Sequence, residues 1–253
     1  MKWILRFFSR SFLIRMSIFF RPLMRIYFRG NKFIDPIDGS GYRKFLPYGY
    51  GKTIRDNALC PGTLSLERHR LLWLYLERET YFFKQKLKVL HVAPEQIFYK
   101  KFKRFLHWDY TTTDLYSPLA DVVADICDLP FQDNQYDLIL CNHVLEHIPK
   151  DLKAMAELYR VLKKGGTLIA QVPLSEERPN TFQDDSITDS NERSKVFGQY
   201  DHVRIYGQDY YHRLESVGFS AERIFIQRHL TKEEIRRYGL PKKEMIPVMH
   251  KQK

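Results

Sequence analysis

The sequence predicts an α/β fold in which helices cover both faces of a mostly parallel, doubly wound sheet. Two observations support this prediction. From residue 87 onward, short apolar runs rich in β-branched residues alternate with amphipathic stretches of about ten to fifteen residues. The chain has 253 residues, of which 44% are hydrophobic and 15% aromatic, enough for one sizeable domain with smaller appendages. Such alternation is typical of strand–helix–strand units with right-handed crossovers.

The expected strands and helices follow one another in regular order. Strands are predicted for six apolar runs: KVLHVA (88–93), DYTTTDL (109–115), ADVVADI (120–126), YDLILCNHV (136–144), TLIAQVPL (167–174) and SAERIFIQRH (220–229). Helices are predicted for QIFYKKFKRFLHW (96–108), DLKAMAELYRVLKKGG (151–166) and GQDYYHRLESVGF (207–219). Upstream, SLERHRLLWLYLERETYFF (65–83) predicts a helix that begins after a Ser65 cap.

The basic charge is concentrated at the two ends of the chain. The net charge is +11, yet residues 1–34 hold eight Lys/Arg and no acid, and residues 229–253 hold seven Lys/Arg and three Glu. The remainder is close to neutral, which argues against a uniformly basic nucleic-acid-binding body. We therefore predict four parts: a basic amphipathic helix (1–30), a small N-terminal subdomain (31–85), the main α/β domain (86–230) and a basic C-terminal tail (231–253).

Residues 1–30 combine arginines with aromatic side chains. Their longest uncharged run, MSIFF, is far shorter than the roughly 20 residues that span a bilayer. The pattern suits a helix lying on an anionic membrane surface, and a helix packed on the main domain or an organelle presequence remain alternatives. We expect a cytoplasmic protein with peripheral contact to the inner face of the membrane. The three cysteines show no paired spacing and are expected to be free thiols.

Polar side chains follow several of the predicted strands. In an open parallel sheet, ligands bind beyond the carboxyl ends of the strands. Asp114 lies 20 residues after Pro94, the spacing at which a carboxylate accepts hydrogen bonds from both hydroxyls of a ribose. Asp125 would accept from an adenine amino group, and the backbone N–H of Ile126 would donate to the ring. The ordered pair of aspartates favours an adenosyl ligand over two unrelated loop caps.

The segment DICDLPFQDNQYDLILCNHVLEHIPKDLKAMAELYRVLKKGGTLIAQVP (125–173) resembles the central half of class I S-adenosylmethionine-dependent methyltransferases. The resemblance extends over about residues 87–228 and implies a Rossmann-like fold, methyl transfer and S-adenosyl-L-methionine as cofactor. It implies that Asp114 holds the ribose and that the turn at 93–96 approaches the methionine portion. The cofactor-binding residues expected on this basis are His91, Ala93, Pro94, Glu95, Asp114, Leu115, Asp125, Ile126 and Asn142.

The first motif departs from the family's acid-x-Gly-x-Gly-x-Gly pattern. His91 stands at the position of the acid, and Ala93, Glu95 and Ile97 stand where the family has glycines. We expect Pro94 at the first helical position and Glu95 facing the cofactor's ammonium group. The alternative is a decayed site that no longer binds cofactor.

The N-terminal subdomain departs from a related pattern. Members of a bacterial branch carry cysteine pairs of zinc-ribbon type where this chain has Asp35-Pro-Ile-Asp38 and Cys60-Pro-Gly-Thr63. With three of four ligands replaced by Asp and Thr, no metal site is predicted. Asp35 and Asp38 are expected to hold their loop by hydrogen bonds from their side chains to nearby backbone.

The acceptor side is expected at the end of the fourth predicted strand and in the polar insertion 175–208. His202 is the first choice of general base, with Asp201 and His143 as alternates and Tyr206 as a further catalytic candidate. Glu146 and His147, at a helix start, are expected to shape their turn. Arg204 would pair with an anionic substrate or with acids of the insertion.

Two classes of function follow from these features. The first is a methyltransferase acting on a small molecule, a sugar or a lipid-linked glycan. The second is a non-catalytic adenosyl-binding or membrane-associated module, suggested by the altered first motif. An RNA substrate is a weaker alternative, because no nucleic-acid-binding module is visible in the sequence.

Overall fold

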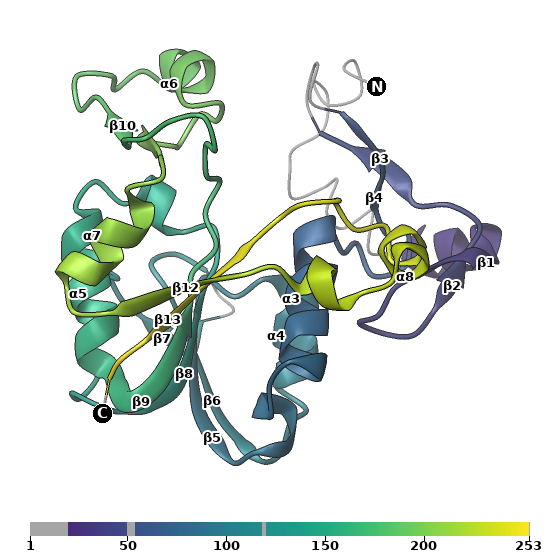
Figure 1. Ribbon diagram of the computed structural model, residues 1–253, viewed down its shortest axis with the longest axis horizontal. Helices are drawn as coiled ribbons and strands as arrows, with labels where there is room; N and C mark the ends of the chain where they lie inside the picture. Colours follow the sequence, from purple (N-terminus) through teal and green to yellow (C-terminus); the bar gives the residue numbers. More distant parts are fainter. Residues whose placement is uncertain (1–19, 50–53, 118–119, 253) are drawn as a thin grey trace. The chain divides into compact units, whose positions relative to one another are not determined.

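The computed structural model describes residues 20–49, 54–117 and 120–252 (Figure 1). The chain divides into two compact units. The smaller unit contains the described residues up to Tyr81 together with Phe225–Glu244, and the larger contains Phe82–Ile224 and the residues from Met245 onward. Residues 225–244, predicted as the end of the main domain and the start of the tail, belong to the smaller unit. The C-terminal segment does not form a separate tail, because residues 246–250 are a strand of the main sheet.

The larger unit is built on a seven-stranded sheet in the order β12-β13-β9-β8-β5-β6-β7. Strands β5 to β9 run parallel, while β13 pairs antiparallel with both β9 and β12. The predicted doubly wound, mostly parallel α/β fold is therefore confirmed. The strand bounds are β5 Leu87–Val92, β6 Trp108–Asp114, β7 Val122–Val123, β8 Tyr136–Cys141, β9 Leu162–Ile169, β12 Ser220–Ile224 and β13 Ile246–His250.

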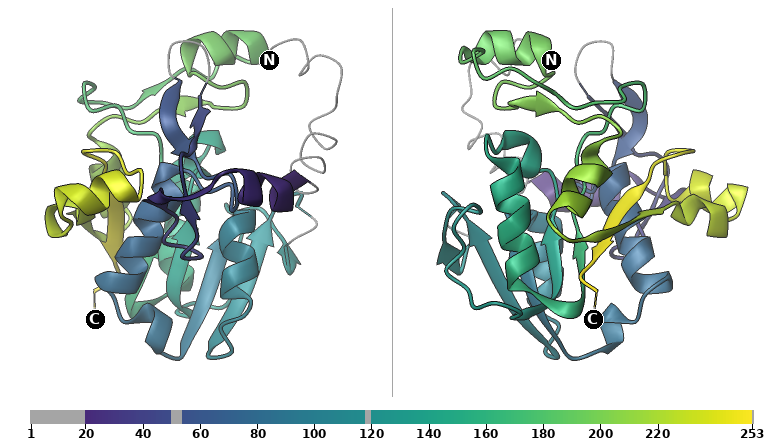
Figure 2. Two further views of the ribbon diagram at one scale, coloured as in Figure 1. Left: turned by 90° about the vertical axis from the view of Figure 1, so that its right-hand side faces the viewer. Right: turned by 60° about the vertical axis from the view of Figure 1, so that its left-hand side comes forward.

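Helices lie on both faces of this sheet, with α5 and α7 on one side and α4 on the other (Figures 1 and 2). Their bounds are α4 Gln96–Phe102, α5 Asp151–Val161 and α7 Tyr210–Ser216. Opposite faces are expected, because right-handed crossovers leave β5 and β8 in opposite directions along the sheet. The central strands β5 and β8 contribute four side chains to a core of fully or nearly fully buried residues: Leu90, Val92, Ile139 and Cys141.

Helix α5 is shorter than the sequence predicted. It ends at Val161, and β9 begins at Leu162, so Lys163 lies in the strand and not in a last helical turn. The Lys163 ammonium donates to Asp137 Oδ1 at 2.7 Å, across to β8. Gly165, with φ +77°, lies in an irregularity of the β8–β9 ladder and not at a helix end. The lysine-rich stretch was misassigned because strand pairing outweighed its helix propensity.

The polar insertion after β9 forms a small substructure of its own. Strands β10 (Phe182–Gln183) and β11 (Arg204–Ile205) pair antiparallel, and α6 (Ser190–Val196) lies between them in the chain. Asp189 caps α6 by accepting hydrogen bonds from the backbone N–H groups of Asn191 and Glu192. After β11, Tyr206 forms a parallel bridge to Leu174, a few residues beyond the end of β9.

The described part of the smaller unit contains the helical residues 20–27, two short hairpins and two further helices. Their bounds are β1 Arg29–Ile34, β2 Gly41–Tyr42, β3 Leu46–Tyr48, β4 Arg55–Leu59, α3 Glu67–Arg78 and α8 Lys232–Arg237, with a 3-10 turn at Ile226–His229. Its core holds the fully buried Arg70, whose guanidinium donates to the carbonyls of Ala58, Ser65, Tyr238 and Gly239. Bonds to four carbonyls satisfy a buried charge that would otherwise be costly.

The loop that replaces the cysteine pattern is held by aspartates, as predicted. Asp35 accepts from the backbone N–H of Ile37 at 2.9 Å, and Asp38 accepts from that of Ser40 at 2.9 Å. The buried Asp35 also accepts from the hydroxyls of Thr63 and Ser65. Because Ser65 is used in this way, it does not cap α3, whose N-cap residue is Leu66.

Of the amphipathic helix predicted for residues 1–30, residues 20–27 are helical and residues 1–19 lie outside the described part of the chain. The predicted helix extends too far at its end, because Phe28 is a turn residue and β1 begins at Arg29. Within the described ranges, every helix is too short or too polar to cross a bilayer. The three cysteines are free thiols, in agreement with the prediction.

Candidate functional site

Three predicted site residues lie side by side because of the strand register. Val92 of β5 pairs with Thr113 of β6 on one side and with Cys141 of β8 on the other. The next residue of each chain segment is therefore a neighbour of the others at the carboxyl edge of the sheet: Ala93, Asp114 and Asn142. This edge is where open parallel sheets bind their ligands.

The turn after β5 has a backbone conformation that is typical of glycine, although it contains no glycine. Ala93 has φ +46°, in the left-handed region, and its N–H donates to Thr113 O at 2.8 Å. Side chains other than glycine adopt this region at a cost of about 1–2 kcal/mol. The expectation for Pro94 was wrong by two positions: Glu95 is the N-cap of α4, and Pro94 precedes it. The turn nevertheless retains the shape for which the family uses glycine.

A chain of hydrogen bonds links β6 to this turn through His91. The His91 ring is fully buried, with Nδ1 2.7 Å from Tyr110 Oη and Nε2 3.3 Å from Glu95 Oε2. A carboxylate only accepts hydrogen bonds, so Nε2 carries the proton and Nδ1 accepts from the tyrosine hydroxyl. Burial raises the pKa of Tyr110 well above its usual value, which keeps that hydroxyl a donor. His91 thereby orients the Glu95 carboxylate.

Asp114 and Asp125 each organise the loop that follows them. Asp114 Oδ1 accepts from the backbone N–H groups of Tyr116 and Ser117, both at 2.7 Å. Asp125 Oδ1 accepts from Cys127 N at 2.8 Å. All of these bonds use one carboxylate oxygen of each aspartate. Leu115 is exposed and Ile126 is buried.

Hydrogen bonds with two residues of helix α5 hold the segment after Ile126 in place. The Arg160 guanidinium donates to the carbonyls of Leu129 and Phe131, both at 2.8 Å. Glu157 accepts from Leu129 N at 2.8 Å and from Arg160. These bonds hold the Leu129–Phe131 segment, which follows the two residues expected to contact the adenine, Asp125 and Ile126.

Asn142 and His143 follow β8 directly. Asn142 is 3% exposed, and its Oδ1 accepts from Gln171 N at 3.2 Å. Its Nδ2 is buried and makes no hydrogen bond with any residue that the structure describes. A buried amide donor left without a protein partner costs about 1–3 kcal/mol and marks a place where a ligand or water belongs. His143 has φ +54°, a second strained residue at this edge.

Three histidines and two acids gather beyond β8, at the 3-10 turn η3 (Leu145–His147). His143 Nδ1 lies 3.3 Å from Glu146 Oε1. His147 Nδ1 lies 3.5 Å from Asp201 Oδ2, and the rings of His147 and His202 cross at 83° with centroids 4.8 Å apart. Burial lowers the pKa of His202 below its usual value, so its ring is neutral at physiological pH.

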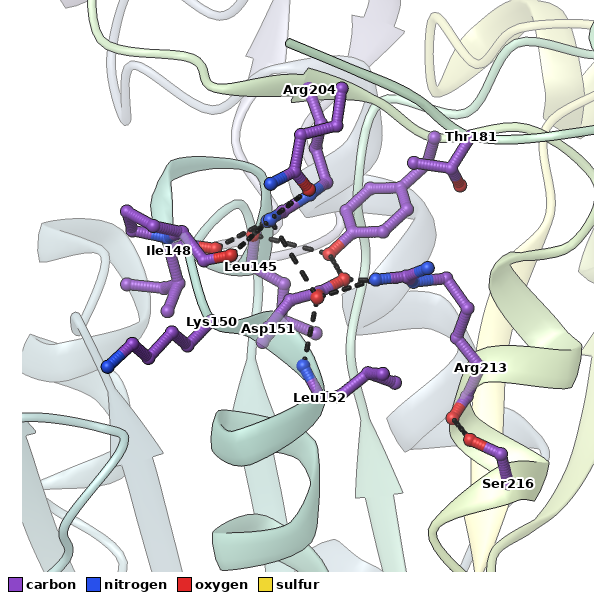
Figure 3. A network of polar contacts seen from close by, with 12 residues as sticks. Leu145, Ile148, Lys150, Asp151, Leu152, Thr181, Arg204, Arg213 and Ser216 are labelled. Atoms are coloured by element: carbon purple, nitrogen blue, oxygen red, sulfur yellow. Dashed lines mark hydrogen bonds and ion pairs between the residues drawn. The ribbon is translucent and has the colours of Figure 1, made fainter. Parts of the chain in front are cut away.

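Arg204 ties the insertion to this turn (Figure 3). Its fully buried guanidinium donates to the carbonyls of Leu145 and Ile148, at 2.7 and 2.5 Å, and to Pro149 at 2.8 Å. Val203 N donates to Glu146 O at 3.0 Å, next to His202. The sequence had left open a contact of Arg204 with an anionic substrate or with acids of the insertion; in the structure Arg204 holds the carbonyls of the η3 turn and so positions His202 against η3.

Tyr206 lies in a structural network and not in the histidine cluster. Its buried hydroxyl donates to Asp151 Oδ2 at 2.8 Å, and Arg213 pairs with Asp151 Oδ1 at 2.6 Å (Figure 3). Burial raises the pKa of Tyr206 far above its usual value, so it has no capacity as a base. The structure instead brings Glu146 and His147 together with His202. Glu146 and His147 follow His143 by three and four residues, and this spacing is the sequence signal for the part of the group that lies at η3.

Comparison with known protein families gives a match over part of the larger unit. Residues 84–170 match the family described as "Methyltransferase domain". An uncharacterized protein of Methanocaldococcus jannaschii is 51% identical over 51 residues, which cover 20% of this chain and 22% of that protein. Ajmaline N-methyltransferase of Rauvolfia serpentina is 32% identical over 82 residues, 32% of this chain and 26% of that enzyme. The aligned segments thus span only about a quarter or less of these curated relatives.

Among solved structures, the cyclase SpnF has a similar fold, with a TM-score of 0.50 and 15% identity over 86% of this chain and 91% of that protein. At this identity the likeness concerns the fold alone.

The residues at the sheet edge fit the cofactor that this family implies, S-adenosyl-L-methionine. Ala93 provides the close backbone turn, and Asp114 has a carboxylate oxygen for the ribose. The buried Asn142 Nδ2 is a donor without an acceptor among the described residues. The match, the sheet order and this donor set agree with one another. Residues 84–170 are therefore similar to a methyltransferase domain, and they lie in a Rossmann-like, mostly parallel sheet of the class I methyltransferase type.

Proposed function

We propose that this protein is an S-adenosyl-L-methionine-dependent methyltransferase. The observation that carries the proposal is the juxtaposition of Ala93, Asp114 and Asn142 at adjacent strand ends. Asp114 holds the ribose hydroxyls, and Asp125 with the Ile126 backbone holds the adenine. Glu95, oriented by His91, faces the ammonium group of the methionine portion. The strained turn at Ala93 lets the backbone approach this portion closely.

The cofactor supplies a methyl group on a positively charged sulfur, which an acceptor displaces in line. The protein's task is chiefly to align the two partners and to exclude water. An acceptor hydroxyl or amine must also lose a proton, and the cluster beyond β8 offers receivers for it. His202 is the first of these because its ring is held neutral by burial, with His143 and Asp201 as alternates. Tyr206 is not among them.

The acceptor class we propose is a small molecule, a sugar or a lipid-linked glycan. The insertion 175–208 places polar side chains next to η3, where an acceptor with hydroxyl groups finds hydrogen-bonding partners. The name of the similar ajmaline N-methyltransferase also denotes a small-molecule acceptor. Incubating the enzyme and labelled cofactor with a fractionated host extract, then identifying the labelled product, tests this choice. Label recovered in RNA would support the alternative acceptor instead.

We further propose a cytoplasmic location with contact to an anionic membrane surface through residues 1–30. The absence of acids among residues 1–34 supports this location. Deleting residues 1–30 should abolish sedimentation with phosphatidylserine vesicles while cofactor binding is retained. Undiminished sedimentation of the deletion variant would assign that segment to packing.

Direct binding of labelled S-adenosyl-L-methionine tests the main proposal. The Asp114→Asn variant keeps an oxygen for the turn at Tyr116 but lacks the charge, and it should bind the cofactor at least about tenfold more weakly. Asp109→Asn, on the same strand β6 but 69% exposed at the opposite edge, is the matched control and should bind normally. If the wild-type protein binds no cofactor, the enzyme proposal fails. If it binds cofactor but methylates nothing in any extract, a non-catalytic adenosyl-binding module is favoured.

A further inference from the structure

Glu146, His147 and His202 form a cluster with the composition of a metal site. Each side chain contributes one possible ligand atom, and these atoms lie within 4.8 Å of one another. Glu146 is 2% exposed and His202 is 9% exposed, so the cluster is largely shielded from water. Two residues come from the η3 turn and the third from the insertion, and the backbone bond from Val203 N to Glu146 O joins the two segments.

A backbone carbonyl orients the imidazole of His147. His147 Nδ1 lies 3.2 Å from Asp201 O, so Nδ1 carries the proton and Nε2 keeps its lone pair. An interaction with the backbone of Phe197 partly offsets the effect of burial, which lowers the pKa of His202. Histidines that bind metals donate their second N–H to a carbonyl or carboxylate in this way, which fixes the tautomer and the direction of the lone pair.

The Glu146 carboxylate supplies an independent observation. Both of its oxygens are buried, and neither accepts a hydrogen bond of good geometry from the residues that the structure describes. His143 Nδ1 lies 3.3 Å from Oε1. A buried carboxylate without donors costs several kcal/mol, and a cation coordinated by its oxygens removes that cost.

We propose that Glu146, His147 and His202 bind a divalent transition-metal cation. Two neutral imidazoles and one carboxylate suit borderline ions such as Zn²⁺, Fe²⁺ or Co²⁺, whereas Mg²⁺ and Ca²⁺ prefer oxygen ligands throughout. Three protein ligands leave coordination positions for water or a ligand atom. His143 acts as a positioning residue that orients the Glu146 carboxylate.

This site goes beyond the proposed methyl transfer and stands without it. The sequence predicted no metal, because its analysis of ligands concerned the N-terminal loop of Asp35 and Cys60. A cation here would occupy the lone pair that His202 needs as a base, so the two roles exclude each other in one molecule. A hydroxyl bound to the cation loses its proton more readily than in water, a consequence that rests on the proposed function.

Titration of the chelator-treated full chain with Co²⁺, in the absence of any cofactor, tests the proposal. We expect one equivalent to bind, with the visible absorption of cobalt in a site of nitrogen and oxygen ligands, and to raise the thermal unfolding temperature. Glu146→Gln and His202→Asn should each weaken binding at least tenfold and abolish the temperature rise. His143→Asn should weaken binding less, because it removes only the support of Glu146.

The matched control is His212→Asn, whose ring is 82% exposed on α7 and lies outside the cluster. It should bind Co²⁺ like the wild type. The proposal is overturned if the wild-type chain binds no equivalent of Co²⁺, or if Glu146→Gln and His202→Asn fold and still bind it undiminished. A variant that fails to fold is replaced by His147→Gln, judged by the same spectrum. Failure here leaves the labelled-cofactor result for Asp114 unaffected, so the two proposals are tested separately.

Discussion

His91 Nε2 lies 3.3 Å from Glu95 Oε2, across the turn that joins β5 to α4. The relationship explains how the chain manages without the acid that the family carries at the position of His91. The carboxylate of Glu95 lies at the same edge, four residues later. The buried His91 ring, which is also hydrogen-bonded to Tyr110, orients this carboxylate.

Removing the Glu95 carboxylate should weaken the binding of the methionine portion selectively. Glu95→Ala is expected to lower the affinity for S-adenosyl-L-methionine about tenfold, because a charge-assisted hydrogen bond to the ammonium group is lost. The affinity for 5′-methylthioadenosine, which has no ammonium group, should change by less than about twofold. Calorimetric titration of both ligands measures the difference. Equal losses for the two ligands would mean that Glu95 only shapes the turn.

Glycine at position 93 should suit the turn better than alanine does. With φ +46°, Ala93→Gly relieves strain and should change the free energy of unfolding by between zero and about +1 kcal/mol, with cofactor binding retained. Ala93→Val adds a β-branched side chain in the same region and should destabilise by at least about 1 kcal/mol. Urea denaturation compares the three proteins. A marked loss of stability in the glycine variant would contradict the strain at this position.

Arg204 should contribute far more to stability than its neighbour Arg213. Arg204→Lys loses the planar fork that reaches three carbonyls and should cost about 3 kcal/mol, because a buried polar network is left partly unsatisfied. Arg213 is 25% exposed and pairs with Asp151, so Arg213→Lys should cost about 1 kcal/mol. Chemical denaturation gives both values. Comparable losses would remove Arg204 from its role in holding the η3 turn.

The bond between Glu157 and Arg160 should make stability depend on pH. Hydrogen bonds from Arg160 and from Leu129 N hold the pKa of Glu157 below its usual value, despite partial burial. A lowered carboxyl pKa adds stability that is present above the unfolded value, about 4.3, and is lost as the pH falls through the folded value. Glu157→Gln should therefore cost about 1 kcal/mol at neutral pH.

The difference between wild type and Glu157→Gln should shrink as the pH falls below about 4. Thermal unfolding of the two proteins across this range measures it. A difference that stays constant with pH would show that the glutamate acts by packing alone. The same variant should loosen the Leu129–Phe131 segment and weaken the binding of the adenine portion.

Strand positions were predictable from the sequence because each central strand is a short apolar run. The β5 and β8 runs are buried on both faces, which leaves a continuous apolar signal. The boundary between α5 and β9 was not predictable, because Lys163 and Lys164 suit a helix end by propensity and their strand pairing depends on distant residues. The seventh strand, Ile246–His250, was missed because it is short and its partners lie far away in sequence.

The sequence by itself determined the order of strands and helices, the candidate residues at the strand ends and the loss of glycines from the first motif. These features are local, since they depend on periodicity and on residue types at fixed spacing. Only the tertiary structure decided which candidates meet. Tyr206 is buried against Asp151, and Arg204 donates to carbonyls of the η3 turn. His202 lies next to Glu146 although more than fifty residues of chain separate them. The physical reason is that burial and unsatisfied hydrogen-bonding groups depend on packing between distant segments, which no local pattern specifies.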